Sequence, residues 1–226
     1  MTVSFDAILF DCDGVLVDSE VITNRVLCTM LNERGWAISQ EECTREFIGK
    51  MVKSQAALIE AKTGKPFNQE WLDEFYVRRN EALRADLVVI DGALDAVKYL
   101  HAQLDGQIAV ASGADRFKVE MQLQKVGLAP YFEGRVFSGH ELPRTKPFPD
   151  VYLAAAKALG AAPERCLVIE DSVTGVLAGV AAGATVWAYF PEDQGHASSA
   201  QLLEAGASRV FSHMGDLPEM WAALPR

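Results

Sequence analysis

The sequence predicts an α/β protein in which a parallel sheet alternates with helices and a helical segment is inserted near the start. Short apolar segments recur along the chain with helix-like segments between them, as in parallel strands joined by helical crossovers. The interval 17–88 breaks this alternation, because it has helical periodicity and no convincing strand. Polar residues directly follow several apolar segments, at the carboxyl ends of strands where open parallel sheets bind ligands.

Six apolar segments are expected to form the strands of the sheet. They are Ala7–Phe10, Ile108–Ala111, Val136–Ser138, Cys166–Ile169, Thr185–Ala188 and Arg209–Phe211. Between the fourth and fifth of these segments, Gly175, Gly179 and Gly183 recur at a spacing of four residues. This spacing is also found in membrane helix dimers, but the surrounding segment is too short and too polar to span a bilayer. We therefore expect these glycines to let a helix pack closely on the sheet.

The interval 17–88 is expected to be an all-helical domain of about four helices. In its first part Ile22, Val26 and Met30 recur every four residues with Leu27 and Leu31 beside them, which gives one apolar helix face. The alternative is that these are crossover helices of the same sheet, but a crossover needs one helix and not four. The sheet domain is then expected to comprise residues 1–16 and 89–226.

Two further patterns mark helices within this insert. Ser39-Gln40-Glu41-Glu42 is a capping-box sequence, which is typical of a helix start. Trp71 with Phe75, and Leu72 with Tyr76, are pairs four residues apart that indicate another helix.

Composition limits the partners and the compartment. The 226 residues include 21 Lys+Arg and 31 Asp+Glu, and the formal charge of −10 disfavours binding to nucleic acid or to anionic membranes. The N-terminal residues do not resemble a signal peptide and no stretch of 18 apolar residues occurs, so a cytoplasmic protein is expected. The four cysteines lack CxxC spacing, which suits buried structural thiols in a reducing compartment: Cys12, Cys28, Cys43 and Cys166.

The polar residues that follow the apolar segments form a candidate site. If the segments are parallel strands, these residues meet at one edge of the sheet. They are Asp11 and Asp13 after the first strand, Ser112 after the second, Glu170 and Asp171 after the fourth, and Lys146 in the proline-bracketed loop 145–149.

Four carboxylates at one edge would raise one another's pKa and destabilise the fold unless a cation neutralised them. Oxygen ligands of this kind suit Mg²⁺, which also coordinates substrate phosphate oxygens. Together with the ammonium group of Lys146, such a site suits a phosphate dianion despite the negative net charge. Phosphoryl transfer also needs a nucleophile, which an Asp carboxylate can supply by forming an aspartyl-phosphate. An Asp two residues further on could protonate the leaving oxygen and later deprotonate water, and Gly14 would permit the tight turn that brings this second Asp into place.

Each residue also has a structural interpretation. An Asp-x-Asp pair is common in surface loops, Ser112 could cap the helix that begins near Arg116, and Lys146 could be a solvated surface charge. The sequence Glu170-Asp171-Ser172 could cap the following helix. The combination, in this order and at strand ends, favours a catalytic site over these separate interpretations.

The motifs Asp11-x-Asp13-Gly14-Val15-Leu16-Val17-Asp18-Ser19, Ser112, Lys146-Pro147-x-Pro149-Asp150-x-Tyr152 and Glu170-Asp171-Ser172 resemble those of the haloacid dehalogenase (HAD) superfamily, in its phosphatase and β-phosphoglucomutase branch. The resemblance covers essentially the whole chain. It implies a Rossmann-like core with an inserted helical cap domain, and an enzyme that cleaves phosphomonoesters. Asp13 favours phosphate chemistry over dehalogenation, because a dehalogenase should lack an Asp at this position.

The resemblance also implies a role for each site residue. Asp11 would be the nucleophile, Asp13 the general acid and base, and Lys146 the group that orients and neutralises the phosphoryl group. Ser112, with the backbone amides of Gly113 and Ala114, would anchor the phosphate. Mg²⁺ would be held by Asp11, the main-chain carbonyl of Asp13 and Asp171, with Glu170 close by.

The cap is expected to influence substrate choice. The segment 47–53 resembles the family's cap loop that reaches the core site, so Gly49, Lys50 and Lys53 are expected to bind substrate, although both lysines could equally be solvated. The resemblance further implies a sugar or sugar-acid phosphate, such as 6-phosphogluconate, as the partner, and the protein is expected to be a monomer or weak homodimer.

Two alternatives remain. One is a mutase of the β-phosphoglucomutase type, which the resemblance weakens, because those enzymes carry a His on the first cap helix where this chain has Thr23. The other is a non-catalytic protein that binds a phosphorylated metabolite.

Overall fold

The computed structural model describes residues 4–47, 50–191 and 198–224, and the chain divides into two compact units. The sheet unit comprises Met1–Val17 and Val89–Arg226, and the helical unit comprises Asp18–Val88. The division falls within one residue of the boundary expected from the sequence.

The sheet unit contains six parallel strands in the order β3-β2-β1-β4-β5-β6. The predicted α/β class is confirmed, and each of the six predicted apolar segments is a strand. Their bounds are β1 (Ala7–Phe10), β2 (Ile108–Ser112), β3 (Val136–Ser138), β4 (Cys166–Glu170), β5 (Thr185–Tyr189) and β6 (Arg209–Phe211). The first strand in the chain therefore lies in the middle of the sheet, between β2 and β4.

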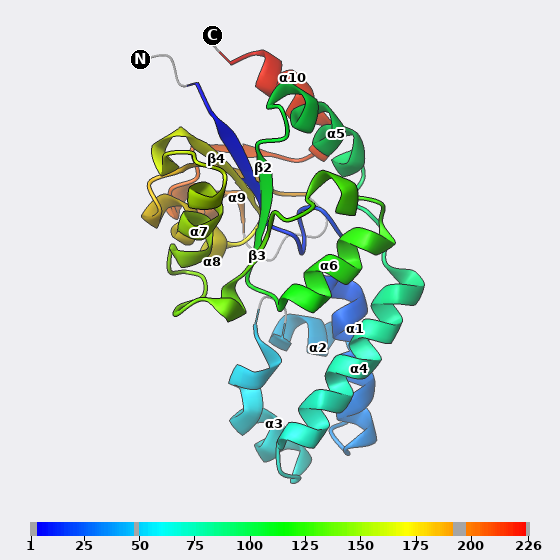
Figure 1. The fold of residues 1–226 in the computed structure, drawn as a ribbon. Helices are drawn as coiled ribbons and strands as arrows, with labels where there is room; N and C mark the ends of the chain where they lie inside the picture. Colours follow the sequence, from blue (N-terminus) through cyan, green and yellow to red (C-terminus); the bar gives the residue numbers. More distant parts are fainter. Residues whose placement is uncertain (1–3, 48–49, 192–197, 225–226) are drawn as a thin grey trace. The chain divides into compact units, whose positions relative to one another are not determined.

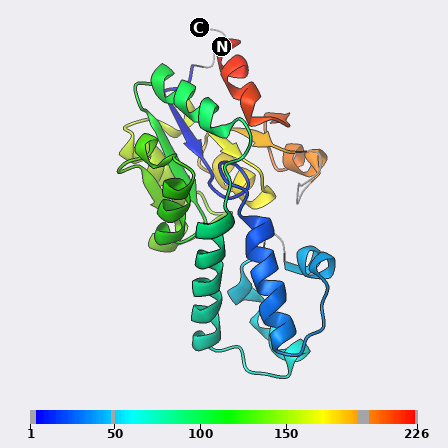
Figure 2. The same cartoon turned by 90° about the vertical axis from the view of Figure 1, so that its right-hand side faces the viewer.

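Helices cover both sides of this sheet. Figure 1 shows α7 and α8 on one side and α5 and α10 on the other, and Figure 2 turns the second side toward the viewer. The α-helices are α5 (Ala93–Gln103), α6 (Arg116–Lys125), α7 (Asp150–Ala158), α8 (Val173–Ala181), α9 (Ser199–Glu204) and α10 (Leu217–Ala222). The 3₁₀ turns are η2 (Ala129–Tyr131), η3 (Gly139–Glu141), η4 (Pro163–Arg165) and η5 (Met214–Asp216).

The central strands are buried on both faces, which explains why their sequences are continuously apolar. Small residues let the helices approach the sheet closely. A Cβ on Gly179 of α8 would collide with Val186 and press on Val168, and a Cβ on Gly175 would collide with the carboxylate of Glu170. Close packing is therefore confirmed for two of the three glycines. The third, Gly183, lies beyond the end of α8 with φ +88°, so it serves the turn into β5 instead.

The helical unit contains α1 (Glu20–Glu33), α2 (Gln40–Phe47), η1 (Val52–Gln55), α3 (Ala56–Thr63) and α4 (Gln69–Asp86). The capping box forms as the sequence predicts, because Glu42 N donates to Ser39 Oγ (3.2 Å) and Ser39 N donates to Glu42 Oε2 (2.9 Å). On α1, Leu27 and Leu31 are buried in a core that Phe75 of α4 also enters. In its described residues this unit thus contains four α-helices and the turn η1, with a hydrophobic core of its own.

Within the described parts of the chain, none of the helices combines the length and the apolar character that crossing a bilayer requires.

Candidate active site

The register of the central strands brings three predicted segments to one edge of the sheet. Phe10 of β1 pairs with Val110 of β2 and with Ile169 of β4. The residues that follow, among them Asp11 and Glu170, therefore lie at the same level across neighbouring strands. This is the edge at which open parallel sheets bind ligands.

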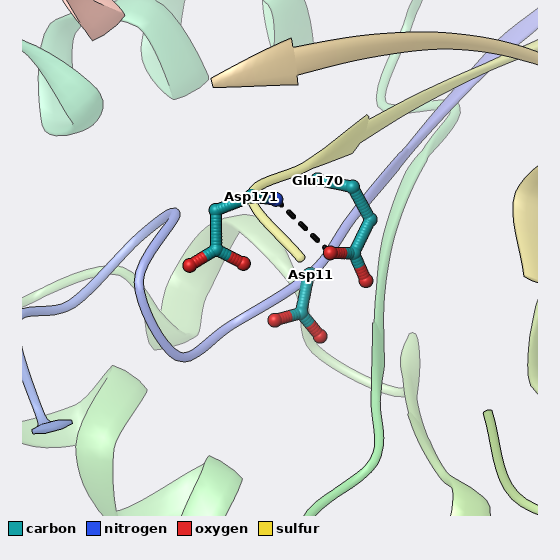
Figure 3. A group of neighbouring side chains, drawn as sticks. All are labelled: Asp11, Glu170 and Asp171. Atoms are coloured by element: carbon teal, nitrogen blue, oxygen red, sulfur yellow. Dashed lines mark hydrogen bonds between the residues drawn. The ribbon is translucent and has the colours of Figure 1, made fainter. Parts of the chain in front are cut away.

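Three of the four predicted carboxylates converge there. Asp11, Glu170 and Asp171 each place a carboxylate oxygen within 4.8 Å of the others (Figure 3). Gly14 has φ +79°, and a Cβ at this position would collide with the Asp171 carboxylate. Glycine is therefore required both by the turn, as predicted, and by the close approach of Asp171. The carboxylate of Asp13 is not part of this group, although its charge acts on Asp11, and the predicted metal contact through the main-chain carbonyl of Asp13 remains a prediction.

Lys146 lies within the cluster rather than in solvent. Its Nζ donates to Asp11 Oδ1 and to Glu170 Oε1, both at 2.6 Å, and its side chain is only 9% exposed. The interpretation of Lys146 as a solvated surface charge is thus wrong. A buried ammonium group that contacts two carboxylates fixes their positions and offsets part of their charge.

Both carboxylate oxygens of Glu170 accept hydrogen bonds from neighbouring residues, including those of the loop after β4. It is fully buried, and its Oε1 accepts from Lys146 and from the hydroxyl of Tyr152 (2.8 Å). Its Oε2 accepts from Asp171 N, Ser172 N and Ser172 Oγ, each at 3.0 Å. With five donors on its two oxygens, Glu170 is better placed to hold Lys146 and the loop than to coordinate a cation directly. Ser172 also caps α8 by accepting from Gly175 N, so the capping interpretation of this motif holds alongside its place in the cluster.

Burial and like charges shift the pKa values of the cluster. Burial raises the pKa of Asp11 to about 7, with the charges of Glu170 and Asp13 adding to the rise and Lys146 opposing it. Burial also raises the pKa of Glu170, but Lys146 and the hydrogen bonds from Ser172 and Tyr152 outweigh it, so the net pKa is below the ordinary value. Burial lowers the pKa of Lys146, and the two carboxylates more than reverse this, so the ammonium form is retained.

Asp13 faces helix α6, in an environment that the sequence did not predict. Its Oδ1 accepts from Lys118 Nζ at 2.8 Å and from Gln122 Nε2 at 2.9 Å. Lys118 and Gln122 are themselves buried. Their spacing of four residues on one helix face was the available signal, but the same spacing is ordinary for solvated polar residues.

The predicted phosphate anchor is a short turn after β2. Ser112 is buried and its Oγ accepts from Ala114 N at 3.1 Å, while Ala114 O accepts from Ser138 Oγ at 2.6 Å. The cap of α6 is Asp115, whose side chain accepts from Lys118 N, and not Ser112. The capping interpretation of Ser112 is therefore wrong, because the helix starts three residues later than that interpretation requires.

The predicted cap residues belong to the helical unit. Lys50 is exposed and pairs with Glu46 at 3.3 Å, and Lys53 is exposed in η1. Gly49 lies outside the described residues. The predicted contact of these residues with substrate remains a prediction.

Comparison with known proteins defines the family. The model of the haloacid dehalogenase-like hydrolases matches residues 5–183. A 6-phosphogluconate phosphatase from Escherichia coli K12 is 32% identical over 221 residues, covering 96% of this chain and 95% of that protein. A HAD family hydrolase structure from Deinococcus radiodurans R1, with bound phosphate and sodium, is 35% identical with a TM-score of 0.81, covering 97% of this chain and 96% of that one. A putative β-phosphoglucomutase structure from Thermotoga maritima, 22% identical, has a TM-score of 0.81 over 96% of this chain and 99% of its own, which shows a shared fold.

The chain therefore belongs to the haloacid dehalogenase-like hydrolases. The family resemblance found in the motifs is confirmed, and so is the prediction of an enzyme of this family's phosphatase type.

Proposed function

We propose that this protein is a Mg²⁺-dependent phosphohydrolase that cleaves a phosphomonoester of a small metabolite through an aspartyl-phosphate on Asp11. The observation that carries the proposal is the arrangement around Asp11. Its carboxylate lies at a strand end, fixed by a buried lysine and grouped with Asp171 and Glu170. Phosphoryl transfer requires a nucleophile, a neighbouring positive charge and carboxylates that can bind a metal ion, and this arrangement supplies all three.

The residues present fit a Mg²⁺ ion. The grouped ligand atoms are all carboxylate oxygens, which a hard divalent cation prefers. The pKa of about 7 for Asp11 is a second indication, because a nearby cation would lower it and keep the nucleophile ionised at neutral pH. Asp11 and Asp171 would hold the ion together with the main-chain carbonyl of Asp13, and Glu170 would order the loop or bind through water. When bound, Mg²⁺ would neutralise charge on the phosphoryl oxygens.

The side chains then divide the work of two displacements. Asp11 attacks phosphorus while Asp13 gives a proton to the leaving oxygen, and in the second step Asp13 takes a proton from the attacking water. Lys146 keeps Asp11 oriented and offsets negative charge as it transfers to the phosphoryl group. Ser112 and the turn through Gly113 and Ala114 would bind the remaining phosphate oxygens. The helical unit would act as the cap that admits substrate, with Gly49, Lys50 and Lys53 contacting its far end.

A sugar or sugar-acid phosphate is the substrate class that we propose, and 6-phosphogluconate is the first compound to test. The named activity of the E. coli relative supports this choice. A mutase that uses the same intermediate is the second candidate, supported by the shared fold and weakened by Thr23, which lies on α1 where the mutases of this family carry a His. A non-catalytic binding protein is a weaker candidate, since every expected catalytic position holds a competent residue.

Release of inorganic phosphate from a panel of phosphorylated metabolites, with Mg²⁺ and with EDTA, tests the proposal. We expect release that requires Mg²⁺ and no phosphorylated isomer among the products. Isomer formation without phosphate release would support the mutase. Binding of phosphorylated metabolites without turnover in either condition would support the non-catalytic candidate.

A further inference from the structure

We propose that Lys118 and Gln122 are positioning residues that hold the Asp13 carboxylate in place for proton transfer to the leaving oxygen. The inference rests on the proposed function, because it assigns a role within that reaction. Neither residue belongs to the motifs that identify the family in this sequence. The observation behind the inference is that both side chains donate hydrogen bonds to the Asp13 carboxylate.

Both residues bind one oxygen atom of Asp13. Lys118 Nζ and Gln122 Nε2 donate to Oδ1 at 2.8 and 2.9 Å, from side chains one turn apart on α6. Lys118 is 8% exposed and Gln122 is fully buried. Burying an ammonium group and an amide is unfavourable unless each has a partner, so their contact with Asp13 is a specific feature and not a chance surface contact.

Further contacts fix these two donors. The Cys12 thiol donates to Gln122 Oε1 at 3.8 Å, so the Gln122 amide joins Cys12 and Asp13, which are neighbours in the chain. The first turn of α6 is capped by Asp115, which accepts from the backbone N–H of Lys118. Helix α6 is therefore anchored at its start and presents both donors to the loop that follows β1.

The two donors fix the orientation of the Asp13 side chain. In the first step the bond from phosphorus to the leaving oxygen breaks, a bond from Asp11 to phosphorus forms, and the proton of the Asp13 carboxyl group moves to the leaving oxygen. Without Lys118 and Gln122 the side chain would sample other rotamers, and fewer of its conformations would direct this proton at the leaving oxygen.

A purely structural role predicts a different pattern of defects. If Lys118 only balanced a buried charge, its loss would lower stability and would reduce turnover of all phosphate esters alike. A positioning role affects esters whose leaving oxygen needs a proton. An alkyl phosphate such as 6-phosphogluconate needs one, whereas 4-nitrophenyl phosphate releases a stable phenolate that does not.

The experiment compares kcat/KM for these two esters, with glucose 6-phosphate as a second alkyl ester. The quantity kcat/KM reports the steps up to phosphoryl transfer to Asp11, so the later attack of water does not enter. Lys118→Met should lower kcat/KM by about 10–100-fold for the alkyl esters and by less than about 3-fold for the aryl ester, since general acid catalysis contributes about 10²–10⁴-fold. Gln122→Met should show the same selectivity with a smaller loss, which keeps the inference testable if Lys118→Met does not fold.

Two reference variants complete the design. Asp13→Asn gives the largest difference between the alkyl-ester and aryl-ester losses of kcat/KM that removal of the acid can produce. Lys157→Met removes an exposed lysine of α7 and should leave kcat/KM unchanged for both ester types. Equal losses for both ester types in Lys118→Met and Gln122→Met, with Asp13→Asn selective, would overturn this inference and leave the proposed function intact. Equal losses in Asp13→Asn itself would contradict the acid role of Asp13 and therefore both proposals, and so would wild-type protein that hydrolyses none of the esters.

Discussion

Asp11 and Asp13 are two residues apart in the sequence, but their side chains occupy different environments. Asp11 faces β4 and its loop, where Lys146 joins it to Glu170. Asp13 faces α6, where Lys118 and Gln122 bind one of its oxygens. Each carboxylate thus has its own buried lysine, supplied by a different part of the chain.

The difference shows how one short loop can separate two roles. In the Asp11 environment several carboxylates gather around one cation, which suits a nucleophile that works beside a metal ion. In the Asp13 environment a carboxylate accepts hydrogen bonds from Lys118 and Gln122, which suits a positioned group that gives up and takes back a proton. Gly14, with its positive φ and its close approach to Asp171, belongs to the turn that directly follows the two aspartates.

The largest effect is expected from Lys146→Met. This change leaves Asp11 and Glu170 buried without their shared ammonium partner, and it removes the charge that offsets the transferring phosphoryl group. We expect kcat/KM to fall by about 10³-fold for alkyl and aryl phosphates alike. A loss of kcat/KM confined to alkyl esters would show that Lys146 assists departure of the leaving oxygen. Lys146 and Lys118 would then have the same role, which would contradict the comparison.

Asp171→Asn tests whether the carboxylates beside Asp11 bind Mg²⁺. Replacing one charged oxygen ligand with a neutral one should raise the Mg²⁺ concentration needed for half-maximal activity by about 10–100-fold. Titration of activity with Mg²⁺ measures this, and Asp216→Asn, which changes an exposed Asp of η5 outside the grouped carboxylates, serves as the matched control. An unchanged Mg²⁺ requirement in Asp171→Asn would exclude this residue as a ligand.

Asp11→Asn should change how stability depends on pH in metal-free protein. The folded-state pKa of Asp11 is about 7, above its ordinary value of 3.8, so the folded state retains a proton that the unfolded state releases between these values. Stability of the wild type should therefore fall as pH rises through this interval. Without this group, the variant should be more stable than the wild type by about 1–4 kcal/mol above pH 7, with the difference vanishing near pH 4. Denaturant unfolding in EDTA at several pH values measures it, and a difference that does not vary with pH would contradict the assignment.

The smallest effects are expected from Asp115→Ala and Ser112→Ala, which distinguish the helix cap from the predicted phosphate anchor. Asp115→Ala removes the cap of α6 and should lower the free energy of unfolding by about 1 kcal/mol. Ser112→Ala removes a hydroxyl that does not cap a helix, so it should reduce phosphate-ester turnover more than stability. Paired measurements of unfolding and kcat/KM distinguish the two, and the reverse pattern would restore the interpretation of Ser112 as a cap.

The strands could be predicted because burial on both faces of the sheet requires apolar side chains at successive positions. Buried parallel strands are continuously apolar, and segments such as Ala7–Phe10 and Cys166–Ile169 have this property. The helical unit was predictable for a related reason, since Trp71 and Phe75 repeat at helical spacing and share its core. The start of α6 was less clear, because Ser112 and Asp115 are both good capping residues and backbone geometry decides between them.

The site was predictable where residues follow strands and obscure where they lie within helices. Asp11, Ser112 and Glu170 are located by strand ends, whose positions the hydrophobic pattern gives. Lys118 and Gln122 lie inside α6, where polar residues are most often solvated, and their contact with Asp13 depends on how α6 packs against the loop after β1. Their spacing of four residues is the local pattern that they share, and it does not determine how the helix packs.

The most direct measurement of the central claim is the detection of phosphate on Asp11 during turnover. Protein that has been acid-quenched within milliseconds of mixing with substrate and Mg²⁺ can be digested and examined by mass spectrometry. We predict a phosphorylated peptide that contains Asp11, is lost on hydroxylamine treatment, and is absent from Asp11→Asn. Steady-state phosphate release that persists in Asp11→Asn, or a phosphoryl group on another residue, would contradict the account.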